Sequence, residues 1–187
     1  MKPASRDRFC SHCGTEFLDT SRYPRAGPNA GCALQTWSNP IPVVVALVPV
    51  VDATRLGVMV IRRSVPPQSG KLALVGGFLE SHESWQQGMT REVREETGVG
   101  IDPATLVPLG YASTEPRPDR VLLFAESETL DAARLPAFTR STESTERGLV
   151  YGPQGLGDVF AFPLHTRALE RFFAERGVQG HHAYRAV

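Results

Sequence analysis

The chain has 187 residues, 20 Lys and Arg against 20 Asp and Glu, a net charge of +0 and 41% hydrophobic residues. These values fit a globular protein of one ordinary domain with a small appendage, and they exclude a largely disordered chain. The balanced charge argues against a protein that binds nucleic acid or a membrane surface, because such binding needs an excess of Lys and Arg. Its 3 cysteines cannot form a disulfide framework without leaving one unpaired.

No targeting or membrane segment is recognisable in the sequence. The first residues are charged, but no apolar run of a signal peptide follows them. The longest apolar stretch, residues 41–51, is about half as long as a membrane helix and is interrupted by Pro42 and Pro49. We therefore expect a cytoplasmic protein without a membrane partner.

Residues 1–40 differ in composition from the rest of the chain. They contain all three cysteines and show little apolar periodicity, so we predict a domain boundary after residue 40. Cys10, Cys13 and Gly14 form a C-x2-C-G pattern, which is typical of a zinc knuckle. Structural zinc sites almost always have four ligands, whereas only Cys32 remains as a third cysteine. Two interpretations stay open: Zn²⁺ bound at these three cysteines, or a degenerate segment with free thiols.

From residue 41 onward, strands and helices follow one another without a regular βαβ repeat, which predicts an α/β or α+β domain at 41–187. The Val-rich stretch 41–51 and the stretch 56–62 predict a hairpin with a turn at 52–54. A short strand over 72–75 is expected to run into Gly76 and Gly77. Two further strands and a closing amphipathic helix are expected at 121–126, 149–151 and 164–175.

The best-defined element is a helix over residues 85–97. Ser84 and Gln87 form a capping-box pattern at its start, and Gly98 follows its end. On a helical wheel, three apolar residues form one stripe, and Glu92, Glu95 and Glu96 lie beside it.

These three glutamates are crowded at the rim of the buried face. Like charges at this spacing repel, and partial burial raises the cost. A divalent cation would reverse this repulsion, and oxygen ligands select Mg²⁺ or Mn²⁺. The alternative is a solvated acidic helix face.

The segment from Gly77 to Val99 resembles the Nudix box, glycine–x5–Glu–x7–Arg–Glu–apolar–x–Glu–Glu–x–Gly–apolar. Every specified position is filled, so this match is far more specific than a short glycine pattern. The resemblance extends over about residues 41–176. It implies a Nudix fold, in which a mixed β-sheet lies between helices. One departure is Val75, where the family often has Pro before the two glycines.

The resemblance also implies a function and a set of site residues. It implies a hydrolase that depends on Mg²⁺ or Mn²⁺ and cleaves the diphosphate linkage of a nucleoside diphosphate joined to another group, with ADP-ribose or an NADH-like dinucleotide favoured. The carboxylates of Glu92, Glu95 and Glu96 and the carbonyl of Gly77 would bind the metal. Arg91 would hold a glutamate in place, and Glu83 would support this network.

The general base is less defined by the resemblance. It implies either a glutamate of the box or an acidic residue some forty residues further on, where this sequence has Glu143 and Glu146. We favour Glu146 as metal ligand or base, with a solvated loop glutamate as the alternative.

Two alternatives concern the whole protein. The chain could be a non-catalytic Nudix domain that senses a nucleotide, although the intact glutamate set favours an enzyme. A zinc-ribbon module that binds nucleic acid is disfavoured by the balanced charge. We therefore expect a nucleotide-derived small molecule as partner. Family members are often dimers, which makes a homodimer a further expectation.

Residues 1–40 are similar to the N-terminal zinc ribbon of some Nudix proteins, including NADH pyrophosphatases. That ribbon has two cysteine knuckles. In the second knuckle, Gly27 and Ala30 stand where cysteines are expected, and Cys32 is displaced by two residues. The resemblance thus implies a degenerate ribbon.

Overall fold

The computed structural model describes residues 8–187, so the first seven residues of the predicted N-terminal segment lie outside the described part. The chain divides into two compact units, Met1–Pro40 and Ile41–Val187. Within residues 8–187, no helix is both long enough and apolar enough to cross a membrane.

The smaller unit consists of two short hairpins. One is closed by an antiparallel bridge between Phe9 and Glu16, and the other pairs β1 (Arg25–Ala26) with β2 (Gln35–Thr36). Its buried residues, within 8–40, are Cys10, Phe17 and Arg25. Arg25 stacks on the rings of Tyr23 and Phe17, at 4.0 and 5.4 Å from their centroids. This unit therefore has almost no hydrophobic core.

The larger unit is built on a nine-stranded mixed sheet. In spatial order its main strands are β11 (Ala183–Ala186), β10 (Ser144–Tyr151), β5 (Arg55–Arg63), β6 (Leu72–Phe78), β3 (Ile41–Leu47), β8 (Arg120–Glu126) and β7 (Val107–Ser113). Two short strands, β4 (Pro49–Asp52) and β9 (Leu130–Asp131), pair with each other, and β4 also pairs with β5. The pairs β3–β8 and β4–β9 are parallel, and the others are antiparallel. Single 3-10 turns occur at Pro103–Thr105 and Ala132–Arg134.

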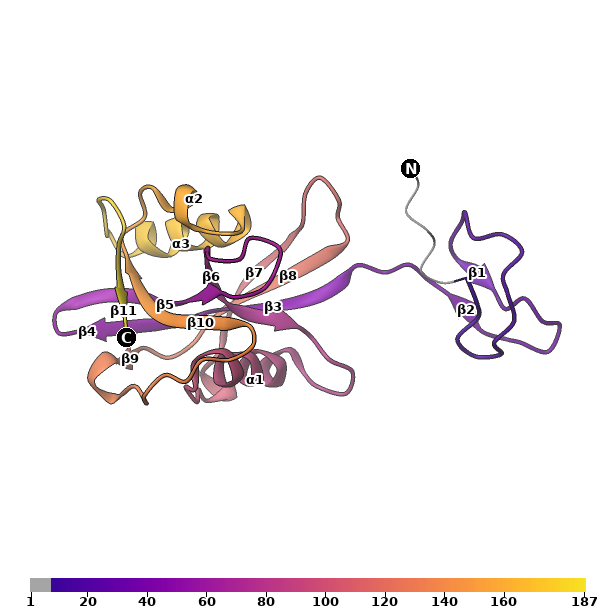
Figure 1. The fold of residues 1–187 in the computed structure, drawn as a ribbon, viewed down its shortest axis with the longest axis horizontal. Coiled ribbons are helices and arrows are strands. Elements are labelled where there is room, and N and C mark those ends of the chain that lie inside the picture. Colours follow the sequence, from indigo (N-terminus) through magenta and orange to yellow (C-terminus); the bar gives the residue numbers. More distant parts are fainter. Residues whose placement is uncertain (1–7) are drawn as a thin grey trace. The chain divides into compact units, whose positions relative to one another are not determined.

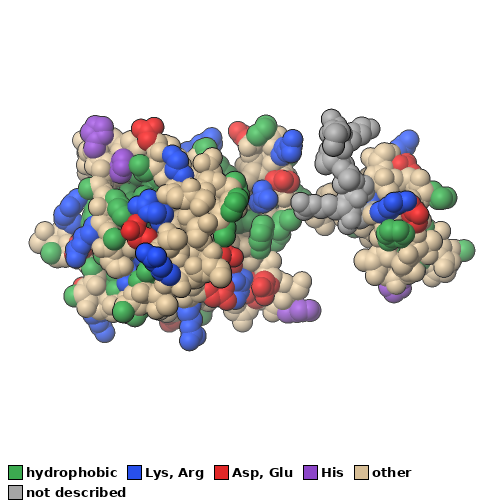
Figure 2. Space-filling view, in the orientation of Figure 1, with side chains coloured by type: hydrophobic (Ala, Val, Ile, Leu, Met, Phe, Trp, Pro, Cys, Tyr) green, Lys and Arg blue, Asp and Glu red, His purple; other side chains and the backbone are tan. Residues whose placement is uncertain are grey.

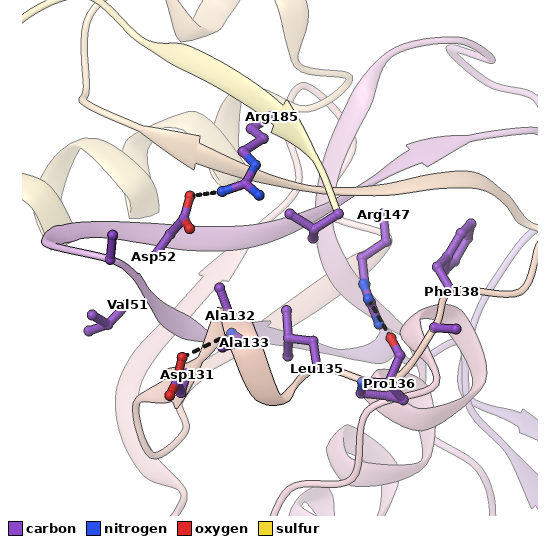
Figure 3. Close-up of a pocket in the computed structure, with 13 residues that line it drawn as sticks. Val51, Asp52, Asp131, Ala132, Ala133, Leu135, Pro136, Phe138, Arg147 and Arg185 are labelled. Atoms are coloured by element: carbon purple, nitrogen blue, oxygen red, sulfur yellow. Dashed lines mark hydrogen bonds and ion pairs between the residues drawn. The ribbon is translucent and has the colours of Figure 1, made fainter.

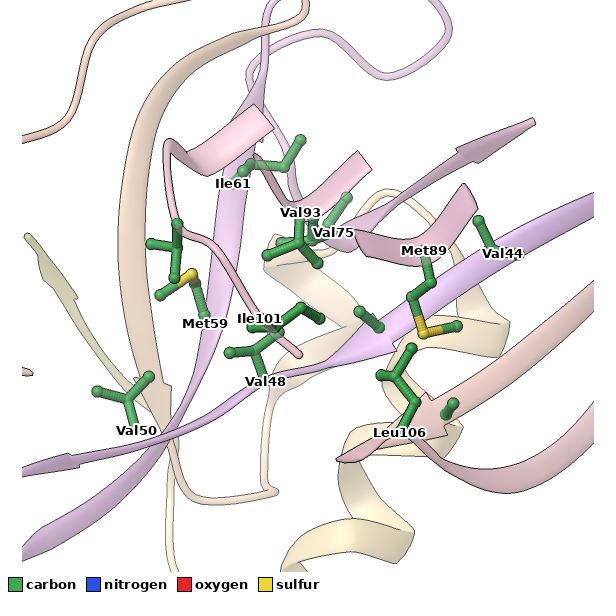
Figure 4. Close-up of a cluster of buried hydrophobic side chains, with 14 of the residues drawn as sticks. Val44, Val48, Val50, Met59, Ile61, Val75, Met89, Val93, Ile101 and Leu106 are labelled. Atoms are coloured by element: carbon green, nitrogen blue, oxygen red, sulfur yellow. The ribbon is translucent and has the colours of Figure 1, made fainter. Parts of the chain in front are cut away.

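Helices cover both faces of this sheet (Figure 1). On one face lies α1 (Trp85–Thr97), whose Met89 and Val93 pack with Val44 and Val75 of the sheet (Figure 4). On the other face lie α2 (Leu156–Val159) and α3 (Pro163–Glu175). Phe172 and Phe173 of α3 belong to a second hydrophobic cluster, separate from the one that contains Met89 and Val93. The predicted architecture, a mixed sheet between helices, is confirmed.

The helix predicted over 85–97 is found with those bounds. Ser84 Oγ accepts a hydrogen bond from Gln87 N–H, and the Gln87 side chain accepts one from Ser84 N–H. Gly98 ends the helix with a φ of 74°, a conformation that glycine adopts without steric cost. Local capping chemistry therefore fixes both ends of α1.

The predicted hairpin between 41–51 and 56–62 is partly wrong. Its second strand, β5, pairs only with the β4 part of the predicted first strand, whereas β3 leaves the hairpin and lies between β6 and β8. The physical reason is burial on both faces: Val44 belongs to the core under α1, and Val45 belongs to the core under α3. A strand buried on both faces pairs in the interior of a sheet, with a neighbour on each edge.

Three strands of the larger unit, β7, β9 and β11, were not predicted. Of these, β9 has only two residues, while β7 and β11 lie at the ends of the sheet and are mostly exposed, so they lack the apolar alternation that marks a half-buried strand. In β7, Pro108 and Gly110 also interrupt the pattern, and the register shifts between them.

Candidate functional site

Arg91 on α1 donates hydrogen bonds to several carboxylates of the candidate site. Its guanidinium donates to Glu83 through Nε at 3.1 Å and Nη2 at 2.8 Å. Nη1 donates to Glu92 Oε1 at 2.7 Å and to Glu95 Oε2 at 3.1 Å. Nη2 also donates to the carbonyl oxygen of Phe78 at 3.0 Å. One guanidinium thus holds three carboxylates and the end of β6 in a fixed arrangement.

The three glutamates of α1 differ in burial because of their places on the helix. Glu92 and Glu96 lie one turn apart on the side that faces the sheet, and they are 8% and 5% exposed. Glu95 points outward, with a side chain 59% exposed. Figure 2 shows acidic side chains gathered near the segment between β6 and α1. The helix therefore offers two buried carboxylates and one at the surface.

Two glycines at the end of β6 bring its backbone against these carboxylates. Gly76 N–H donates to Glu96 Oε2 at 2.9 Å. A Cβ added at Gly77 would lie 2.6 Å from Glu92 Oε2, so only glycine leaves room for that carboxylate. Gly88 serves Glu83 in the same way, because a Cβ there would lie 2.8 Å from Glu83 Oε1. The glycines allow the backbone to approach these carboxylates closely.

The protein environment disfavours the ionised forms of the buried pair. Burial raises the pKa of Glu96 to about 8, with further contributions from the charges of Glu92 and Glu143. Burial likewise raises the pKa of Glu92, and Arg91 partly opposes this shift. In contrast, the hydrogen bonds from Arg91 lower the pKa of Glu83. Two buried carboxylates with raised pKa values therefore lie beside Glu83, whose pKa is lowered.

The structure does not bring Glu146 into this bonded group. Its Oε2 accepts from Arg62 Nε and from the hydroxyl of Tyr184, both at 2.7 Å. Of the two candidates, Glu143 is the one whose charge contributes to the raised pKa of Glu92 and Glu96, and it is exposed in the turn before β10. The sequence analysis named both Glu143 and Glu146 as candidates and favoured Glu146. In the structure, Glu146 instead bonds to Arg62 of β5 and Tyr184 of β11.

The turn that carries Glu143 is tied to the helix and to β5. The fully buried Ser144 donates its hydroxyl to the carbonyl oxygen of Glu96 at 2.9 Å. Ser64 N–H donates to the carbonyl oxygen of Glu143 at 2.9 Å. Sequence patterns gave no signal for Ser144 or Ser64, because both contacts join segments far apart in the chain.

A hollow of about 780 Å³ in the larger unit lies away from the glutamates. Figure 3 shows its lining, where Arg185 pairs with Asp52 and Arg147 donates to the carbonyl oxygen of Pro136. Arg147 also donates to Thr97 at the end of α1, at 2.8 Å. Its lining contains none of the residues expected from the sequence to act in the site.

The structure brings the three cysteines of the smaller unit together. The ligand atoms of Cys10, Cys13 and Cys32 all lie within 4.8 Å of one another, although Cys32 was expected to be displaced. The sulfurs of Cys10 and Cys32 are 3.8 Å apart, and all three thiols are free. Hydrogen bonds from Thr15 lower the pKa of Cys13 to about 7. These thiols form a compact group suited to a soft or borderline metal ion.

Comparison with known proteins matches the chain to the NUDIX domain family over residues 40–147. The chain is 34% identical over 103 residues to the NAD-capped RNA hydrolase NudC of Stutzerimonas stutzeri (strain A1501), covering 53% of this chain and 34% of that protein. It is 30% identical over 133 residues to NudC of Pseudomonas aeruginosa (strain LESB58), covering 71% of this chain and 45% of that protein. The chain thus spans less than half of the length of these curated relatives.

Solved structures share the fold. A NUDIX hydrolase from Nitrosomonas europaea superposes with a TM-score of 0.69 at 24% identity, covering 94% of this chain and 97% of that one. The NUDIX domain of Shewanella oneidensis NrtR, solved with ADP ribose, gives a TM-score of 0.56 at 18% identity, covering 76% and 91%. With the family match over more than half of the residues, these findings establish that the chain belongs to the Nudix family.

Proposed function

We propose that this protein is a divalent-metal-dependent hydrolase that cleaves the diphosphate linkage of a nucleoside diphosphate joined to another group. The observation that carries the proposal is the buried pair Glu92 and Glu96, packed against the glycines at the end of β6. Burying two neighbouring carboxylates is costly unless cations compensate them. Arg91 supplies one such charge, and it is shared with Glu83 and Glu95.

The donor set fits Mg²⁺ or Mn²⁺. Carboxylate and carbonyl oxygens are the ligands that these hard cations prefer, and in this region acidic groups outnumber the one bonded arginine. Glu92, Glu95, Glu96 and the carbonyl of Gly77 would hold the metal. When bound, such ions polarise phosphoryl oxygens and lower the pKa of a coordinated water.

The chain's own residues orient this oxygen set. Arg91 fixes the rotamers of Glu92 and Glu95, and Glu83 fixes Arg91 in turn through two hydrogen bonds. We assign the role of metal ligand or general base to Glu143 rather than Glu146. Its charge acts on the buried pair, whereas Glu146 already accepts two hydrogen bonds from Arg62 and Tyr184.

The substrate class follows from the relatives and from the charge of the chain. The curated relatives are named for NAD-capped RNA, and the NrtR domain was solved with ADP ribose. Both NAD and ADP-ribose contain an ADP unit joined through its diphosphate to a second group. A net charge of +0 provides no general attraction for an RNA body. We therefore favour ADP-ribose or an NADH-like dinucleotide as the substrate.

A second metal is proposed for the smaller unit, where the three thiols support Zn²⁺ binding. Sulfurs bound to a tetrahedral zinc ion at about 2.3 Å lie about 3.8 Å apart. The sulfurs of Cys10 and Cys32 have this separation, 3.8 Å.

The proposal is tested by a turnover screen with Mg²⁺ and with Mn²⁺. The substrates are ADP-ribose, NADH, NAD-capped RNA, a nucleotide sugar and a nucleoside triphosphate. We expect hydrolysis of an ADP-linked compound, with more than about a 100-fold loss in Glu96→Gln. Glu170→Gln, an exposed position on α3, is the matched control.

The alternative, a nucleotide sensor, makes a distinct prediction for the same proteins. If calorimetry detects ADP-ribose binding but neither the native protein nor Glu96→Gln turns over any substrate, the enzyme proposal is refuted. Retained turnover in Glu96→Gln would refute its assignment as a metal ligand.

The choice between Glu143 and Glu146 is tested by two amide variants. Glu143→Gln should lower kcat about 10²- to 10⁴-fold, as expected when a general base is removed. Glu146→Gln should retain activity and lose less than about 1 kcal/mol of stability, because its ion pair with Arg62 is more than a third exposed on both sides. The opposite pattern of activity would restore Glu146 to the role that the sequence suggested.

A further inference from the structure

The two hairpins of the smaller unit are built alike, which identifies the equivalent positions. In the first, Cys10 follows the bridged residue Phe9 and donates its N–H to Thr15. In the second, Gly27 follows the paired residue Ala26 and donates its N–H to Leu34. Gly27 is therefore the counterpart of Cys10.

The residues whose carbonyl oxygens accept these bonds, Thr15 and Leu34, identify a second pair of equivalent positions. Cys13 lies two residues before Thr15, and Cys32 lies two residues before Leu34. Cys32 is therefore the counterpart of Cys13, displaced in sequence because the second loop is longer. Of the four equivalent positions, three carry thiols, and the fourth, Gly27, has no side chain.

The absence of a side chain at Gly27 shapes the position of Cys32. A Cβ added at Gly27 would lie 2.6 Å from both the Cβ and the carbonyl oxygen of Cys32, and it would also overlap the Cys32 sulfur. The Cys32 thiol thus fills the space that a residue-27 side chain would take. Among residues 8–187, no fourth His, Cys, Asp or Glu side chain belongs to the group formed by Cys10, Cys13 and Cys32, whose ligand atoms lie within 4.8 Å of one another.

The smaller unit also needs something besides a hydrophobic core to order it. Within residues 8–40, the buried side chains are Cys10, Phe17 and Arg25. Segments of this size are usually ordered by disulfides or metals, and the three thiols here are free. A metal bound by the thiols would join the two hairpins.

We infer that Cys10, Cys13 and Cys32 form a three-thiolate metal site whose fourth coordination position is open to a small ligand from solvent. This inference rests on the zinc binding proposed above and is independent of the hydrolase. The ligand is water or a small external thiol, because the residues that the structure describes add no fourth side-chain ligand to this group and Cys13 and Cys32 are partly exposed. A structural zinc site with four protein ligands has no such open position.

Cobalt substitution in the full chain tests the inference. Thiolate-to-Co²⁺ charge-transfer absorption reports sulfur ligands alone, so Co²⁺ at the glutamates does not contribute. We expect about one thiolate-bound Co²⁺ per chain, protection of all three thiols from a thiol reagent, and a saturable spectral change on adding 2-mercaptoethanol.

Three variants sharpen this test. Cys32→Ser should weaken metal binding by more than about 10-fold, and Gly27→Ala should do the same by displacing the Cys32 thiol. His12→Ala, at the exposed histidine between Cys10 and Cys13, is the control and should leave the spectrum and the thiol response unchanged. The hydrolysis assay on the same proteins separates a failure of this site from a failure of the proposed function.

Several outcomes would overturn the inference. Absence of any response to the external thiol would mean that a fourth protein ligand closes the site, and appearance of the response in His12→Ala would identify His12 as that ligand. A single reactive thiol without bound metal would indicate a disulfide between the other two. Zinc content well below one ion per chain after growth and metal loading, measured by elemental analysis, would also refute it.

Discussion

The guanidinium of Arg91 is the single group that contacts the most carboxylates in the site. It donates to Glu83, Glu92 and Glu95 and also to the backbone of Phe78. Planar donors in a fixed fork are required for these simultaneous contacts, and a lysine ammonium cannot reproduce them. The arrangement of the glutamates therefore depends on the shape of this side chain as well as on its charge.

Arg91→Lys keeps the charge and removes the fork. We expect the apparent Mg²⁺ affinity to fall about 10- to 100-fold, because the carboxylates lose their fixed orientation. The measurement is turnover as a function of Mg²⁺ concentration. Arg94→Lys, at an exposed position of the same helix, should behave like the native protein. A native-like Mg²⁺ affinity in Arg91→Lys would show that the charge alone is sufficient.

Gly77 makes a steric contribution to the same site. In Gly77→Ala, the new methyl group would overlap the carboxylate of Glu92, so that side chain must move. We expect weaker Mg²⁺ binding and a stability loss of about 1–3 kcal/mol, the usual cost of overpacking. Gly100→Ala is the control, because an added Cβ there meets nothing within 4 Å. Calorimetric Mg²⁺ titration and urea unfolding measure the two effects. An unchanged Mg²⁺ affinity would exclude Gly77 from the metal site.

At the scale of elements, His165 links α3 to the sheet. Its Nδ1 accepts a hydrogen bond from Leu74 N–H of β6 at 3.1 Å, and the ring is buried between these elements. Burial lowers the pKa of His165 from 6.5 to about 3, with a smaller effect from the charge of Arg63. The folded state therefore keeps this imidazole neutral where the unfolded chain would protonate it.

This difference in the pKa of His165 predicts that acid lowers the free energy of unfolding. Above pH 6.5 both states carry neutral His165, and its contribution to stability is fully present. As the pH falls from 6.5 toward 3, the unfolded chain takes up a proton that the folded protein does not, so the free energy of unfolding decreases. Between pH 7 and pH 5 this amounts to about 2 kcal/mol. The measurement is urea unfolding of the native protein and of His165→Asn, which keeps an acceptor near Nδ1. The variant should lose less stability on acidification, and parallel pH profiles would contradict the prediction.

At the scale of the whole molecule, the two units are stabilised in different ways. Both hydrophobic cores consist of residues from Val43 onward. The smaller unit has three buried side chains within residues 8–40 and the cluster of thiols. We propose that the boundary predicted after residue 40 separates two units that fold independently.

A chain limited to residues 41–187 tests this proposal. It should unfold cooperatively, with a melting temperature within a few degrees of the main transition of the full chain, because no member of either core is removed. Thermal unfolding followed by circular dichroism is the measurement, and addition of Zn²⁺ should have no effect on the shorter chain. A shorter chain that lacks a cooperative transition would show that the larger unit depends on residues 1–40.

Local patterns in the sequence were sufficient for α1 and for much of the site. The capping residues at both ends of α1 act within a few positions of each other, so they predict the helix bounds directly. Helical spacing likewise brings Glu92 and Glu96 to one face. The order of the strands could not be predicted in this way, because β3 pairs with β6 and β8 through contacts distant in sequence.

The sequence by itself determined the Nudix motif, the acidic helix and the unusual cysteine content of the first 40 residues. Only the tertiary structure decided that Glu146 pairs with Arg62 and Tyr184 and that Ser64 and Ser144 hold the turn before β10, because these contacts join segments distant in the chain. It also decided that Cys32 joins the other two cysteines, because hydrogen bonding across each hairpin, and not spacing along the chain, sets where a thiol lies.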